Sequence, residues 1–82
     1  MADIQFTKDN LSVYMKELKG NVFKVVVSEY NRNGGASREE SFPGFERSSD
    51  VFKKIIDASI SGAAYPQLCD ILGEKAPAEE VA

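Results

Sequence analysis

The residues of this chain that could do chemistry are aromatic and basic side chains gathered around one β-branched segment. Residues 22–30 contain Lys24 and Tyr30 and run into a glycine-centred loop that has an arginine on each side. Unpaired bases stack on aromatic rings and cations follow the backbone phosphates, so this combination fits a single-stranded nucleic acid. A duplex would require a helix or ribbon shaped for a groove, and no helix-turn-helix pattern is present. The candidate nucleic-acid-binding residues are Tyr14, Lys16, Lys24, Tyr30, Arg32 and Arg38.

The residue types that serve most enzymes and metal sites are scarce. The chain has no histidine and one cysteine, Cys69. It therefore has neither the commonest general base nor a Ser–His or Cys–His nucleophile. A zinc site needs several Cys or His ligands, which a single cysteine cannot supply. We expect a protein that is not an enzyme and uses no cofactor or metal, with Cys69 as a small buried hydrophobic side chain.

The charges are unevenly distributed along the chain. The net charge of −3 argues by itself against nucleic acid, because nucleic-acid-binding domains usually carry a basic surplus. However, residues 8–54 hold nine basic and seven acidic side chains, whereas residues 74–82 hold three acids and one lysine. This distribution predicts a single domain over residues 1–73 and a flexible acidic tail over residues 74–82. The tail could stay solvated, bind a partner protein, or compete with nucleic acid for the protein's own cations.

Length and composition limit the class of protein. Eighty-two residues with 43% hydrophobic and 28% charged side chains are typical of one small globular domain. A chain this short buries a modest fraction of its surface, so association of identical copies is a natural way to add burial. No apolar run is long enough to cross a bilayer, and no apolar signal block follows the first residues. We expect a cytoplasmic homo-oligomer that does not bind membranes.

Strands are the elements that must position the candidate residues. Residues 4–7 alternate apolar and polar side chains, as a half-buried strand does. A glycine-rich loop at 31–37 and a returning strand at about 38–42 would follow the strand 22–30. Pro43-Gly44 then has the residue order of a type II turn. The uniformly apolar side of the strand 22–30, which should face the core, consists of Phe23, Val25 and Val27.

Segment 11–18 allows two interpretations. Its apolar residues share a face at the period of a strand, and a similar set forms a stripe at helical spacing between Asn10 as a cap and Gly20 as a stop. We favour the strand, because residues 19–21 lead directly into residue 22 and would make a short hairpin. The choice matters for function, because only a strand places Tyr14 and Lys16 on the same side as Lys24 and Tyr30.

The C-terminal half predicts two helices. Residues 48–50 offer N-caps for the first, which would end at Gly62, and the second would run from Pro66 to Gly73. With the strands, they predict an α+β fold in which two C-terminal helices cover one face of an antiparallel sheet of three to four strands. The apolar stripe of the first helix is Val51, Phe52, Ile55, Ile56 and Ile60. That of the second, the expected element of self-association, is Leu68, Ile71 and Leu72.

Two short segments have a structural and a functional interpretation. Gly34-Gly35 between the two arginines is either a flexible hairpin tip or a loop that cradles phosphate through backbone N–H groups. Phe42 and Phe45 flank Pro43-Gly44. Either both phenylalanines pack under the helix, or one is exposed as an anchor for a partner or a base.

The six candidate residues, followed by the acidic pair Glu79-Glu80, give a layout that resembles small virus-encoded single-stranded-DNA-binding proteins. The resemblance implies a viral protein of the host cytoplasm that binds DNA on a compact sheet and carries an acidic C-terminal tail. The chain is shorter than a full five-stranded OB barrel requires. The alternative function, which the acidic net charge favours, is a modulator that mimics nucleic acid and docks on a host or partner protein.

Overall fold

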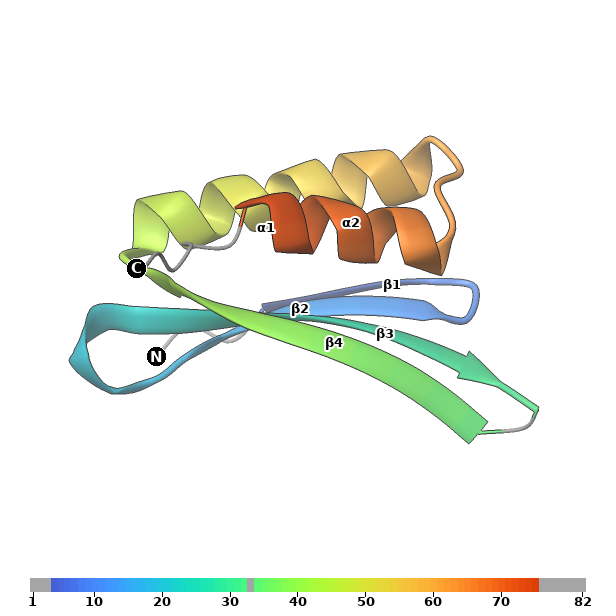
Figure 1. The fold of residues 1–82 in the computed structure, drawn as a ribbon, viewed down its shortest axis with the longest axis horizontal. Helices are drawn as coiled ribbons and strands as arrows, with labels where there is room; N and C mark the ends of the chain where they lie inside the picture. Colours follow the sequence, from blue (N-terminus) through green and yellow to red (C-terminus); the bar gives the residue numbers. More distant parts are fainter. Residues whose placement is uncertain (1–3, 33, 76–82) are drawn as a thin grey trace.

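The computed structural model describes residues 4–32 and 34–75, which form a four-stranded antiparallel sheet with two helices on one side (Figure 1). The strands lie in the order β1-β2-β3-β4, so each strand pairs with its neighbours in the chain. This arrangement confirms the predicted α+β class and the two C-terminal helices on one face. The elements are β1 (Ile4–Lys8), β2 (Leu11–Glu17), the 3-10 turn η1 (Lys19–Asn21), β3 (Val22–Asn31), β4 (Gly34–Pro43), α1 (Phe45–Ile60) and α2 (Tyr65–Lys75).

Strand β2 resolves the ambiguous segment 11–18 in favour of a strand. It pairs with β1 on one side and with β3 on the other, so its backbone groups join two ladders at once. The hairpin to β3 is tight, with the Leu18 N–H donating to the Val22 carbonyl at 2.7 Å. Gly20 and Asn21 adopt the positive φ angles of 69° and 61° that such a turn requires.

The face of the sheet under the helices, the covered face, forms the core. The predicted inward side of β3 is confirmed, since Phe23, Val25 and Val27 are all 4% exposed or less. The other buried strand residues on this face are Val13, Met15 and Phe42. They pack against five buried helix residues: Val51, Phe52 and Ile55 from α1, and Leu68 and Leu72 from α2.

Helix α1 begins at Phe45, several residues before the predicted caps at residues 48–50. The ring of Phe45 packs edge-on against Phe23, with the ring centroids 5.6 Å apart, although Phe45 remains 48% exposed. Ser48 is buried and its hydroxyl donates to the Gly44 carbonyl. Gly44 itself has ψ of 147°, far from the 0° of a type II turn, so the predicted turn is replaced by a direct entry into the helix. Packing therefore sets the helix start here in place of the local capping signals.

Strand β4 is longer than predicted. Asn31 pairs with Gly34, so most of the expected loop at 31–37 is part of the β3–β4 hairpin. The glycines are strand residues, and the phosphate-cradling loop does not form as such. The sequence did not indicate this because β4 lies at the edge of the sheet, where exposed positions need no apolar alternation.

Helix α2 passes through Gly73, which was predicted to end it. A Cβ at Gly73 would lie 2.9 Å from Nη2 of Arg38, so the missing side chain makes room for the guanidinium. Glu74 and Lys75, assigned to the tail from the sequence, belong to α2, and the rest of the predicted tail lies outside the described residues. Neither helix in the described part of the chain is long and apolar enough to cross a membrane.

Candidate nucleic-acid interface

The side of the sheet away from the helices, the open face, carries polar and aromatic side chains. Strand alternation and register place these residues together, because residues paired directly across an antiparallel ladder point to the same side. Four of the six candidate residues belong to this face, as predicted. The residues that we call the open face are Gln5, Thr7, Ser12, Tyr14, Lys16, Lys24, Val26, Ser28, Tyr30, Ser37, Glu39 and Ser41.

Two lysines lie directly opposite each other on the open face. Lys16 of β2 pairs in register with Lys24 of β3, and like charges placed this way destabilise a sheet. Glu39 offsets one of them, since its Oε1 lies 3.4 Å from Nζ of Lys24. Lys16 is exposed and makes no ion pair with any residue that the structure describes. An anion bound beside this pair would relieve the remaining repulsion.

Tyr14 lies next to the lysine pair and borders a shallow depression of about 330 Å³. The register places Tyr14 opposite Gln5 on β1 and opposite Val26 on β3. The depression thus combines an aromatic ring with a cation, which is the combination that a nucleotide requires. Its lining residues are Ile4, Gln5, Ser12, Tyr14 and Lys16.

Tyr30 borders a second depression, of about 370 Å³, near the other end of β3. Both backbone polar groups of Tyr30 are bonded to Asn10: the Tyr30 N–H donates to the Asn10 carbonyl at 2.9 Å, and Nδ2 of Asn10 donates to the Tyr30 carbonyl at 2.8 Å. Across the hairpin it faces Gly35, which has no side chain to cover the ring. Tyr30 is consequently 77% exposed on a fixed backbone.

Two polar residues that the sequence did not single out line both depressions. Gln5 lies opposite Tyr14 on β1, Ser12 lies opposite Ser28, and Nε2 of Gln5 donates to Oγ of Ser12 at 3.0 Å. Nε2 also lies 3.4 Å from Oγ1 of Thr7. Alternation alone would have placed both residues on the open face, but uncharged polar side chains carry no signal of their own.

Arg38 does not belong to the open face, and its predicted grouping with Tyr30 is wrong. It pairs in register with Val27, a fully buried residue of the covered face, and its guanidinium lies against Gly73 of α2. A seven-residue loop at 31–37 would have paired Arg38 with Tyr30. The much tighter hairpin shifts the register by an odd number of residues, which moves Arg38 to the other side.

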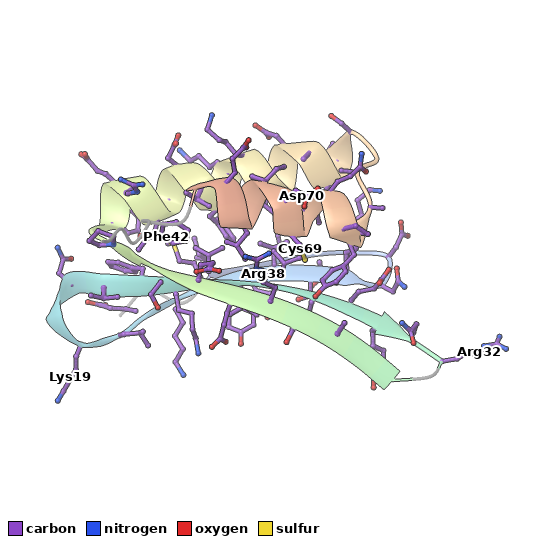
Figure 2. All side chains as sticks on the ribbon, in the orientation of Figure 1. Lys19, Arg32, Arg38, Phe42, Cys69 and Asp70 are labelled. Atoms are coloured by element: carbon purple, nitrogen blue, oxygen red, sulfur yellow. The ribbon has the colours of Figure 1, made fainter. Side chains whose placement is uncertain are left out.

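Two further basic residues lie at opposite ends of the sheet (Figure 2). Arg32, a predicted candidate, is exposed at the end of the β3–β4 hairpin and points away from the sheet. Lys19, which is not among the six candidate residues, extends from the β2–β3 hairpin on the side away from the helices (Figure 2). Lys19 follows Lys16 by three residues, so it adds charge to the end of the open face that holds the lysine pair.

A separate polar group lies between α2 and the covered side of β4. Nη2 of Arg38 is 3.2 Å from Oε2 of Glu40, and Cys69 of α2 hydrogen-bonds with Tyr65. Burial, and then this hydrogen bond, raise the pKa of Tyr65 to about 12. Cys69 is half-buried, so it is less enclosed than predicted. No group of three metal-ligating side chains occurs among residues 4–32 and 34–75.

Comparison with known proteins finds no matching family, no similar curated protein and no similar solved structure. The function must therefore be argued from the geometry of the open face.

Proposed function

We propose that this chain binds single-stranded nucleic acid, DNA in preference, on the open face of its sheet, without catalysing a reaction. The observation that carries the proposal is that the Lys16–Lys24 pair, Tyr14 and Tyr30 follow one another along the same face of β2 and β3. Cations at one end can hold phosphates while the two rings receive bases. The resemblance to virus-encoded DNA-binding proteins is part of the same proposal.

The spacing of the two rings suits two separate stacking positions. Tyr14 lies opposite Val26, and Tyr30 is four residues farther along β3. At a rise of about 3.3 Å per residue the two positions are about 13 Å apart, too far for both rings to hold one base. Gln5 and Ser12 line both depressions and offer hydrogen-bonding groups to a ligand in either of them.

The expected energetics set a condition on this binding. Two stacked bases contribute about 2–6 kcal/mol, whereas a micromolar complex requires about 8 kcal/mol. Phosphate contacts with lysine must supply the remainder, and such contacts weaken as salt rises because bound counterions are released from the strand. Binding on the open face should therefore depend on both the rings and the salt concentration.

The test is a fluorescence-anisotropy titration of labelled oligo-dT with the full chain at low and moderate salt. We expect micromolar binding that weakens with salt, and a salt slope that falls by about 0.7 in Lys16→Ala because one phosphate contact is lost. Tyr30→Ala should weaken binding by about 5- to 150-fold, the loss of one stacked base.

Lys53→Ala is the matched control for charge. Lys53 is exposed on α1, on the far side of the sheet from the open face, so its removal changes the net charge equally without touching the proposed site. Affinity should be unchanged in this variant. Equal losses of affinity in Lys53→Ala and Lys16→Ala would mean that the charge of the whole chain attracts the oligonucleotide and that the open face is not a defined site. Absence of binding at low salt would overturn the proposal and favour the acidic modulator of a partner protein.

A further inference from the structure

Strand β4 lies at the edge of the sheet, and within the described chain its backbone pairs with β3 on one side and with no strand on the other. Its ten residues pair with β3, and residues 34–41 are exposed apart from the half-buried Glu40. Neither helix covers this edge. Helix α2, which lies in front of α1 in Figure 1, packs against the covered side of β4 and leaves its outer edge open. An uncovered edge of this length is a template for pairing with another strand.

The charges in the middle of β4 select one way of pairing it with a second copy of itself. Identical strands that pair antiparallel, with both sheets facing the same way, are related by a two-fold axis that passes midway between the two copies of one residue. We call this an axis at that residue. An axis at Glu39 places each Arg38 opposite Glu40 of the second copy, and each Ser37 opposite Ser41. An axis at Arg38 would instead place two arginines opposite each other, and an axis at Glu40 would place each Arg38 opposite Phe42. Neither of these axes pairs an arginine with a glutamate of the second copy, so the axis at Glu39 is favoured although its two Glu39 side chains also face each other.

The side chains at this edge are arranged to accept that register. Arg38 and Glu40 both lie on the covered side, and their side chains are 44% and 30% exposed. The guanidinium has five donors, so it can hold its own Glu40 and that of a second copy together. The two Glu39 side chains that would meet at the axis each have a Lys24 of their own chain 3.4 Å away, which offsets their repulsion. Pro43 has no N–H and ends the ladder near α1.

We propose that two copies of this chain pair antiparallel through residues 37–41 of β4, centred on Glu39. The pairing joins the two four-stranded sheets into one continuous sheet with both open faces on the same side. It replaces the self-association predicted through α2, because Leu68 and Leu72 are fully buried within one chain and Ile71 packs, partly buried, against the same core. If the proposed function holds, the paired open faces would also raise avidity for one strand of nucleic acid.

The first experiment measures the mass of the full chain in solution by sedimentation equilibrium, for the wild type and for R38E and E40R, alone and mixed. The wild type should be a dimer, and each variant alone a monomer, because like charges then face each other across the axis. The equimolar mixture should dimerise again, because one copy carries only acidic and the other only basic groups at positions 38 and 40. The Arg38–Glu40 ion pair within each chain stays broken in both variants, also in the mixture. Recovery of the dimer can therefore come only from contact between the two copies.

A second experiment does not depend on the charge variants. With Cys69 replaced by serine, E39C should form a disulfide with its own counterpart on oxidation, since residues opposite each other at the axis have Cα atoms about 4.5–5.5 Å apart. S37C should not do so, because its counterpart lies about 13 Å away, four residues along the partner strand. K53E, a charge reversal on α1, should leave the dimer intact.

Any one of four results would overturn the pairing. These are a monomeric wild type, single variants that dimerise as the wild type does, a mixture that stays monomeric, and equal cross-linking of S37C and E39C. All of these measurements are made without nucleic acid. Their failure would therefore leave the proposed function standing, and a chain that dimerises without binding oligo-dT would refute only the function.

Discussion

The covered face and the open face are built from the same strands, yet their side chains are buried to very different extents. Every strand residue of the core is at most 4% exposed, whereas the open face has one buried residue among those described, Val26 at 3%. The covered face can therefore change little without loss of the fold. The open face is free to carry rings and charges, because few of its side chains contribute packing.

The largest effect should come from the covered face. Phe42→Ala removes a fully buried ring where β4 meets the helices, and we expect the free energy of unfolding to fall by about 3–5 kcal/mol. Urea denaturation followed by circular dichroism measures the change. Ser41→Ala, at the adjacent exposed position on the open face, should change stability by less than about 0.5 kcal/mol. Similar losses in the two variants would remove the contrast between the faces.

A smaller effect should come from the one buried position on the open face. Val26 lies between Tyr14 and Glu39 in the register, and Val26→Ala should cost about 1–2 kcal/mol of stability from the apolar surface lost. The same urea titration measures it, with Ser28→Ala on the same strand as the control. A loss as large as that of Phe42→Ala would show that the open face has a packing role equal to that of the core.

The smallest effect concerns pH and the polar group under α2. The pKa of Tyr65 is raised to about 12 in the folded chain, whereas its ordinary value is 10.0. Between these values the unfolded chain loses the proton and the folded chain keeps it, so stability falls as pH rises through this window. Tyr65→Phe should reduce that fall when the free energy of unfolding is measured at several pH values above about 9. An unchanged pH dependence in the variant would contradict the assigned cause.

The elements of the fold were predictable where side chains alternate or recur strongly. The inward side of β3 and most of the apolar stripes of the two helices are set by burial, and burial leaves a periodic pattern in the sequence. Ile60, which belongs to the predicted stripe of the first helix, is an exception because it is 59% exposed. The start of α1 was not predictable, because Phe45 packs on Phe23, which is distant in the chain, and local caps do not report such a contact.

The candidate interface was predictable only in part, for a related reason. Tyr14, Lys16, Lys24 and Tyr30 share a face because alternation within β2 and β3 requires it once both are strands. Arg38 could not be placed, because its side depends on the hairpin register, and the small, polar start of β4 has no apolar pattern to define it. Gln5 and Ser12 become part of the site only when β1 lies beside β2.

Local geometry sets which residues of each strand lie on opposite sides and which sides of the helices are apolar, so both can be deduced from the chain before it folds. Contacts between distant segments make segment 11–18 a strand, since its two neighbours pair with its backbone. The same kind of contact turns Arg38 toward α2 and brings Leu68 and Leu72 into the core of one chain. Register and burial depend on contacts between residues distant in the chain, and no local pattern records them.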